Sequence, residues 1–145
     1  TKSKNPIKLK LVTEEHRPFS SIVKWDSAKW SPISKPGRAQ ATLLRIESGR
    51  SRFGDCFVMP YYKSGSGKTG RSLDRPLGTV TTKDRWAIVK GNNMRMLSVE
   101  EYRRAMSFPE NTILPRRKDQ AVHALGNATC PKLVRKVLAA LLKAA

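Results

Sequence analysis

Cysteine is scarce in this chain of 145 residues, which contains only Cys56 and Cys130. Two cysteines are too few for a disulfide framework or a zinc cluster, so we expect a reducing cytoplasm and no metal site. Long apolar runs are missing as well, because none approaches the roughly 18 residues of a membrane-spanning helix. The charged start shows no signal peptide, and a first residue that is Thr rather than Met suggests a fragment.

Acidic residues are also few, and this is the strongest signal in the composition. Only 11 Asp and Glu residues face 29 Lys and Arg residues, which gives a net charge of +18. Such a charge attracts polyanions, and binding to nucleic acid gains free energy from released counterions. An anionic membrane is the competing interpretation, but it needs a basic amphipathic helix, whereas the charge here is spread along the whole chain. We therefore favour nucleic acid and expect no membrane association.

Periodicity and breaker residues predict short strands around one helix in the first two thirds of the chain. The helix is expected over residues 38–49, with Gly49 as its stop. The strands are expected at residues 22–25, 56–62, 86–90 and 94–97. Pro60 should keep the far end of its strand away from a central position in the sheet. A turn at Gly91-Asn92-Asn93 separates the last two strands.

Helical signals dominate the last third of the chain. Ser98 and Glu101 form a capping box, which marks a helix start. Three helices are expected: from this box to about Met106, over 118–125, and from Pro131 onward. Gly126 should stop the second helix. The third has an apolar stripe of Leu133, Val134, Val137, Leu138, Leu141 and Leu142.

The Gly-, Ser- and Lys-rich composition of residues 63–72 predicts a flexible basic loop. Within it, the run from Gly65 to Thr69 resembles part of a phosphate-binding loop. Tyr62 holds the place of that motif's first glycine and no helix follows, so we do not expect nucleotide hydrolysis. The basic residues beside Tyr61 and Tyr62 instead suit contact with a nucleic-acid strand, although a plain mobile loop has the same composition.

Two segments carry more information than composition does. Residues 74–85 contain Arg-Pro followed by three threonines, Thr79, Thr81 and Thr82, which we call the threonine run. Residues 95–131 begin with Arg-x-Leu-Ser-x-x-Glu, continue through Phe-Pro and end with Gly-Asn-Ala-Thr-Cys-Pro. In this order the segments resemble motifs IX and X of the bacterial and phage cytosine-5 DNA methyltransferases. Ser107, Thr129 and Lys132 depart from the family's pattern, which has Gly, Val and Pro at these places.

The resemblance implies an α+β fold: a small target-recognition subdomain with short strands, followed by a C-terminal helical segment. Together they would be a fragment of a larger α/β, Rossmann-like methyltransferase. We expect a basic irregular leader at residues 1–36, a target-recognition region with motif IX at 37–97, and C-terminal helices with motif X at 98–145.

The elements with which this family performs catalysis are missing from the sequence. These are a glycine-rich loop for S-adenosylmethionine, a Glu-Asn-Val triplet, a Gln-x-Arg-x-Arg motif and a nucleophilic cysteine that follows a proline. Cys130 precedes Pro131, and Cys56 should be a packed thiol in a strand. We therefore expect no catalytic residue here, and a catalytic domain or subunit with the nucleophilic cysteine as partner.

The resemblance also implies that residues 38–73 read duplex DNA through its major groove. Our candidates for phosphate or guanine contact are Arg50, Arg52, Lys63, Lys68 and Arg71. For each of them a solvated surface residue is an equal alternative. Motif IX adds Arg75, Thr79, Thr81 and Thr82, which we expect to organise the recognition region and to make some phosphate contact.

The turn Gly126-Asn127-Ala128 is implied to lie beside the S-adenosylmethionine pocket of the catalytic domain, with Asn127 nearest the cofactor. The last helix is implied to pack on that domain through its stripe. Without the domain, the stripe should be partly exposed or covered by a dimer contact. His123, one turn earlier, should be a packing or surface histidine rather than a base.

We therefore expect the DNA-recognition and C-terminal part of a DNA cytosine-5 methyltransferase, as found in restriction–modification. The enzyme would transfer a methyl group from S-adenosylmethionine to cytosine C5, and this part alone would be inactive. The alternative is a free-standing basic DNA-binding module without enzymatic activity. An RNA-binding structural protein would explain the charge but not the pair of motifs.

Overall fold

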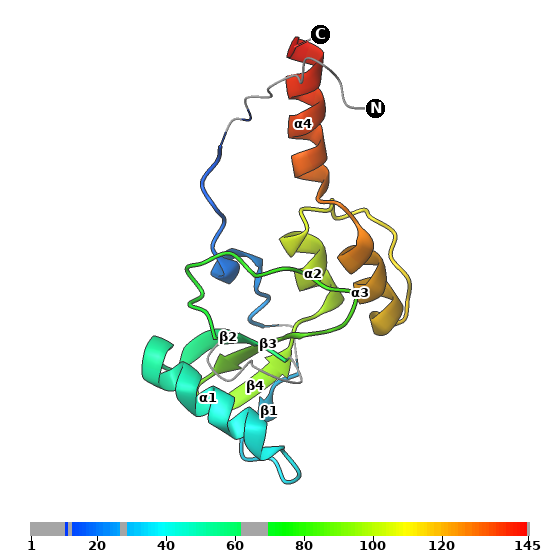
Figure 1. Ribbon diagram of the computed structural model, residues 1–145. Helices are drawn as coiled ribbons and strands as arrows, with labels where there is room; N and C mark the ends of the chain where they lie inside the picture. The colour runs from blue at the N-terminus through cyan, green and yellow to red at the C-terminus, as the bar shows by residue number, and fades with distance from the viewer. Residues whose placement is uncertain (1–10, 12, 27–28, 62–69, 145) are drawn as a thin grey trace.

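The computed structural model describes residues 11, 13–26, 29–61 and 70–144. It is a mixed α+β fold in which one antiparallel sheet lies between two helical layers (Figure 1). The strands are β1 (Ser31–Pro32), β2 (Cys56–Pro60), β3 (Trp86–Lys90) and β4 (Asn93–Met96), in the order β1-β4-β3-β2.

The centre of the sheet follows the sequence-based prediction closely. β3 is a short apolar run that is buried from Trp86 to Val89, as expected of a strand covered on both faces. It turns at Gly91, whose φ of 53° suits glycine, and pairs back onto β4 with Val89 opposite Met94. β2 forms the far edge, where Pro60 lies opposite Trp86, so the prediction that Pro60 avoids a central strand is confirmed.

Helix α1 (Gln40–Phe53) covers one face of the sheet. Ile46 packs there against the buried side chains Phe57, Met59, Ala87, Val89 and Met94. The predicted stop at Gly49 is wrong: the helix runs through it and ends at Gly54, whose φ is 73°. A Cβ on Gly49 would lie 2.1 Å from the Phe57 ring, so this glycine allows α1 to approach β2 closely.

The other face of the sheet is covered by the 3₁₀ helix η1 (Phe19–Ile22) and by α2 (Val99–Ala105) and α3 (Lys118–Asn127). This layer holds the larger core, made of Phe19, Ile22, Val23, Val58, Trp86, Ile88, Leu97, Tyr102, Val122 and Leu125. The capping box at Ser98 is present as predicted. The predicted stop at Gly126 is wrong, because α3 continues through Asn127.

The strand predicted over residues 22–25 does not form. Ile22 ends η1, and Ile22 and Val23 are both buried although they are consecutive, which is not the alternation of a strand with one exposed face. The backbone N–H of Lys24 donates to the Glu101 carboxylate rather than to a strand. The edge of the sheet is instead taken by Ser31–Pro32.

Helix α4 (Pro131–Ala144) begins at Pro131 as predicted. It extends away from the sheet and the other helices, which we call the body (Figure 1). It has no buried residue. Its large apolar side chains are exposed: Leu133, Val134, Leu138, Leu141 and Leu142. The expectation of a partly exposed stripe is confirmed. None of the helices within the described residues has the length and apolar character that crossing a bilayer requires.

Candidate functional site

A buried ion pair between β4 and α2 also holds the distant segment at Lys24. Arg95 on β4 donates two hydrogen bonds to the Glu101 carboxylate on α2, at 2.6 and 2.8 Å. The same carboxylate accepts the backbone N–H of Lys24 at 2.9 Å and that of Ser98 at 2.8 Å. Arg95 also donates to the Lys24 carbonyl at 3.1 Å. The two side chains are 3% and 1% exposed, so the pair is fully inside the fold.

The environment of Glu101 keeps it ionised. Burial raises the pKa of this carboxyl, but the hydrogen bonds from Arg95, Ser98 and Lys24 outweigh burial and hold the pKa below its usual value. A buried pair that is bonded in this way is costly to break from one side, because the remaining charge is left unpaired. The cluster therefore fixes α2 and the segment at Lys24 against the sheet.

A second polar chain connects α2 to the segment after the threonine run. The Tyr102 hydroxyl accepts the backbone N–H of Trp86 at 3.1 Å and donates to Asp84 at 2.8 Å. Asp84 also pairs with Lys118 at the start of α3, at 2.5 Å. Burial and the nearby Asp84 carboxylate raise the pKa of Tyr102, so the phenol stays a donor. These contacts attach the segment Asp84–Trp86 to α2 and to α3.

The threonine run itself has no regular secondary structure. The Thr79 carbonyl accepts the indole N–H of Trp86 at 3.1 Å, and the Thr81 hydroxyl donates to the Lys83 carbonyl at 3.1 Å. Gly78 lies so close to the Trp86 ring that a Cβ there would be 2.7 Å from it. The run is therefore held by its backbone, and the side chain of Thr79 is exposed.

The threonine run and the Gly-Asn-Ala turn are in direct contact. A Cβ on Gly126 would lie 2.3 Å from the Thr81 carbonyl carbon and 2.5 Å from the Thr82 nitrogen. Only a residue without a side chain allows this approach, which explains why glycine occurs inside α3. The two segments lie far apart in the sequence but form one surface.

A groove of about 820 Å³ opens beside this contact. Its walls come from the segment before η1, from Pro76–Val80, from the end of α2, and from Gly126, Ala128 and Leu133. Glu14 lies over it and pairs with Lys132 and with Lys136, the latter at 2.9 Å. Hydrogen bonds from these two lysines lower the pKa of Glu14 to about 2. The groove thus runs from the threonine run to the first turns of α4.

The residues of the Gly-Asn-Ala turn have different exposures. Ala128 lines the groove, whereas Asn127 is exposed and its amide lies 3.0 Å from the His123 ring. His123 is a surface residue, as expected. Ser107, also on the groove, is the only described non-glycine residue with positive φ, at 59°. This is the position at which the family pattern has glycine.

The predicted DNA-contact residues do not lie in one place. Arg50 donates to the Gly91 carbonyl at 2.7 Å and to Asn92 at 3.0 Å, so it fastens α1 to the β3–β4 turn. The guanidinium carbon of Arg52 lies 4.7 Å from the centre of the Phe53 ring, and that of Arg71 lies 5.8 Å from the centre of the Trp86 ring.

Three further basic candidates are Arg75, Lys63 and Lys68. Arg75 is exposed and lies four residues before Thr79. Lys63 and Lys68 lie outside the described residues, as do Tyr62 and the run from Gly65 to Thr69. The contact of each candidate with DNA stays a prediction.

Sequence reasoning missed the partners of two buried residues, Arg95 and Tyr102. The spacing in Arg95-x-Leu-Ser-x-x-Glu101 was a usable signal for the first, because it places an arginine just before a capping box. Cys56 is half-buried, and burial raises the pKa of its thiol. Within the described part of the chain, His, Cys, Asp and Glu form no group of three that could hold a metal ion.

Comparison with protein families relates this site to known enzymes. The chain matches the family model described as C-5 cytosine-specific DNA methylase over residues 11–143. The matched stretch includes both the threonine run and the Gly-Asn-Ala turn. Neither a search of curated proteins nor a search of solved structures gave a match.

Proposed function

The chain belongs to the C-5 cytosine-specific DNA methylase family, and from this premise we propose that it is the DNA-recognition and C-terminal portion of a DNA cytosine-5 methyltransferase. The contact between Gly126 and Thr81 carries the proposal. It brings the motif IX and motif X segments onto one surface, beside a groove and an exposed apolar helix. A catalytic region that docks there would meet both motifs at once.

The groove residues fit one wall of a cofactor site. Gly126 and Ala128 offer backbone and a small side chain, and Asn127 offers an exposed amide. We assign these three residues to the edge of the S-adenosylmethionine site. The cofactor supplies the methyl group, and the remaining walls come from the catalytic region. The role of the chain is to close the site and to orient the DNA.

The target-recognition region, residues 37–97, provides the DNA contacts in this proposal, and we call it the recognition half. Acting on a cytosine inside a duplex requires its extrusion, so the backbone on both sides must be held. Arg75 and Thr79 are both exposed and lie four residues apart in the chain, and the backbone of Thr81 and Thr82 is held against Gly126. Phosphate contacts are assigned to Arg75 and Thr79, and base reading to the segment around Arg52, Lys63, Lys68 and Arg71.

Helix α4 is the docking element for the catalytic region. Five large apolar side chains on one 14-residue helix are exposed, and a monomer rarely leaves such a stripe uncovered. A free-standing DNA-binding module would have to cover it with a second copy of the chain. The missing proline–cysteine nucleophile must then come from the partner, because neither Cys56 nor Cys130 follows a proline.

Methyl transfer tests this proposal. The chain alone should transfer no radiolabelled methyl group from S-adenosylmethionine to duplex DNA, and a mixture with the cognate catalytic region should do so. Leu138→Asp with Leu141→Asp should abolish transfer by the mixture, while Lys143→Gln, on the same helix, should not. Transfer by the isolated chain would refute the proposal, and an inert mixture would favour the free-standing module.

A further inference from the structure

A series of contacts links basic side chains and one tyrosine from α1, past the end of β2, to the start of α3. Its members are Arg45, Tyr61, Lys83, Arg85, Arg117 and Lys118, and we call it the basic strip. We propose that the basic strip contacts the phosphate backbone of duplex DNA, so that α3 binds DNA together with the recognition half. This inference rests on the proposed function and adds residues that the motif comparison did not suggest.

The recognition-half end of the basic strip is built around Tyr61. The Tyr61 backbone N–H donates to the Arg85 carbonyl at 2.6 Å, and the Arg85 guanidinium donates to the Tyr61 carbonyl at 3.1 Å. The Arg45 guanidinium lies 6.0 Å from the centre of the Tyr61 ring. One guanidinium group thus lies over the Tyr61 ring, and another is bonded to the Tyr61 backbone at the end of β2. Guanidinium groups bind phosphate oxygens, so this end of the basic strip suits a phosphate backbone.

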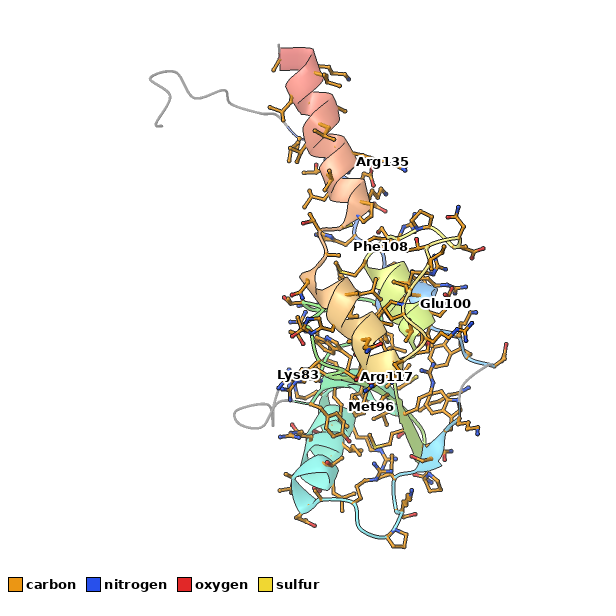
Figure 2. All side chains as sticks on the ribbon, turned by 90° about the vertical axis from the view of Figure 1, so that its right-hand side faces the viewer. Lys83, Met96, Glu100, Phe108, Arg117 and Arg135 are labelled. Carbon is orange, nitrogen blue, oxygen red and sulfur yellow. The ribbon has the colours of Figure 1, made fainter. Side chains whose placement is uncertain are left out.

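Asp84 joins the end of the basic strip at α3 to the end at Tyr61. This carboxylate pairs with Lys118 at 2.5 Å, which brings the start of α3 against the segment Lys83–Arg85. Figure 2 shows Lys83 and Arg117 at the same level, where α3 begins. Asp119 pairs with Arg117 at 2.8 Å and holds its side chain.

The exposure of the basic strip favours an anionic partner. Lys83 is exposed, and the side chains of Arg117 and Lys118 are 72% and 45% exposed. The two carboxylates in the strip, Asp84 and Asp119, are each bonded to one of its cations, so positive charge remains in excess. The outward face of α1 is less basic, because it shows Gln40, Ala41, Leu44, Glu47 and Ser51 with Arg52 as its exposed cation. A sugar–phosphate backbone is the partner that matches a line of exposed cations.

The basic strip would add a second line of contact to the one proposed for the recognition half. Phosphate contacts fix the register and orientation of a protein on the duplex without reading its sequence. Contacts from α3 would hold the recognition half in one orientation relative to motif X, because Lys118 and Gly126 belong to the same helix. The strip therefore sets how the recognition half and the cofactor wall face the DNA together.

The salt dependence of DNA binding tests this inference on the full 145-residue chain. The double variant Lys83→Gln/Arg117→Gln removes two cations of the basic strip, and Lys29→Gln/Lys35→Gln removes two exposed lysines elsewhere, so both have the same net charge. Dissociation constants for one duplex are measured against salt concentration. Removing two phosphate contacts should reduce the slope of log K against log salt by about 1.8. The control slope should match the wild type, and thermal unfolding should show both variants folded.

The outcomes separate the inference from the proposed function. Equal slopes for the strip variant and the control would overturn the inference and leave the proposed function standing. A strip variant that keeps its DNA slope but no longer binds the catalytic region would also overturn it, because the strip would then be a protein interface. A wild-type chain that fails to bind duplex DNA would overturn both. Lys83→Arg/Arg117→Lys should keep the wild-type slope.

Discussion

Strand β3 and helix α4 are both apolar segments, but their surroundings are opposite. β3 is buried from Trp86 to Val89 with at most 2% exposure, whereas α4 has no buried residue and its Leu142 is 81% exposed. Other parts of this chain cover the strand on both faces, and nothing among the described residues covers the stripe of the helix. Apolar content alone therefore does not tell which surface a segment packs on. The body closes on itself, whereas the apolar stripe of α4 is left exposed.

The largest effect in the body should come from Glu101→Ala. This change leaves Arg95 buried without its partner and should destabilise the fold by about 3–5 kcal/mol, because an unpaired buried charge is costly. Asp119→Ala on α3 is the control. Its pair with Arg117 joins two exposed side chains, so its loss should cost less. Urea unfolding measures both; equal losses would show that the body does not depend on its buried pair.

Gly126→Ala should produce the next largest effect. The new methyl group would overlap the Thr81 carbonyl, and the resulting strain should cost about 1–3 kcal/mol even though alanine favours helices. Amide chemical shifts at Thr81 and Thr82 should change as the segments separate. Gln120→Ala, at an exposed position of α3, should leave both stability and these shifts nearly unchanged. Unchanged amide chemical shifts at Thr81 in Gly126→Ala would mean that the two motif segments are not in contact.

Ser107→Gly should stabilise the body by roughly 1 kcal/mol. Ser107 has a φ of 59°, a conformation in which an L-residue is strained and glycine is not. The gain is limited because glycine also increases the entropy of the unfolded chain. Ser51→Gly, inside α1, should have the opposite sign. A difference in melting temperature measures both, and loss of stability in the first variant would contradict the backbone assignment.

The smallest body effect should be a change in acid sensitivity with Glu100→Gln. Hydrogen bonds from Arg103 lower the pKa of Glu100 from 4.5 to about 2. A lowered pKa means that this stabilisation is fully present above pH 4.5 and is lost as the pH falls through about 2. The urea midpoint of the variant should therefore decrease less than that of the wild type between pH 5 and pH 2. Parallel pH profiles would show that this pair adds nothing.

The elements that could be predicted from sequence are those with local signals. β3 is an apolar run between a charged segment and a turn, the helix at Ser98 has its capping box, and α4 begins at a proline. The two misread glycines show the limit. Gly49 and Gly126 look like helix stops, but what requires glycine is tertiary packing: the Phe57 ring of the following strand at Gly49, and the Thr81 backbone of a distant segment at Gly126.

The candidate site follows the same rule. Its two motifs were identified from short patterns, and the structure places them in contact. The pairing of Glu101 with Lys24, 77 residues away, could not be inferred, because it depends on how the chain returns to the sheet. The bond from the Arg50 guanidinium to the turn at Gly91 could not be inferred either, and the contact of Arg50 with DNA stays a prediction. The three-part division of the chain and the cofactor contacts stay predictions.

Hydrogen exchange of the α4 amides tests the contrast between body and helix most directly. In the isolated chain, α4 should exchange much faster than β3, because none of its residues is buried. Adding the cognate catalytic region should slow exchange in α4 and leave β3 unchanged. If α4 is already as protected as β3 in the isolated chain, or does not respond to the catalytic region, then α4 is not the docking element.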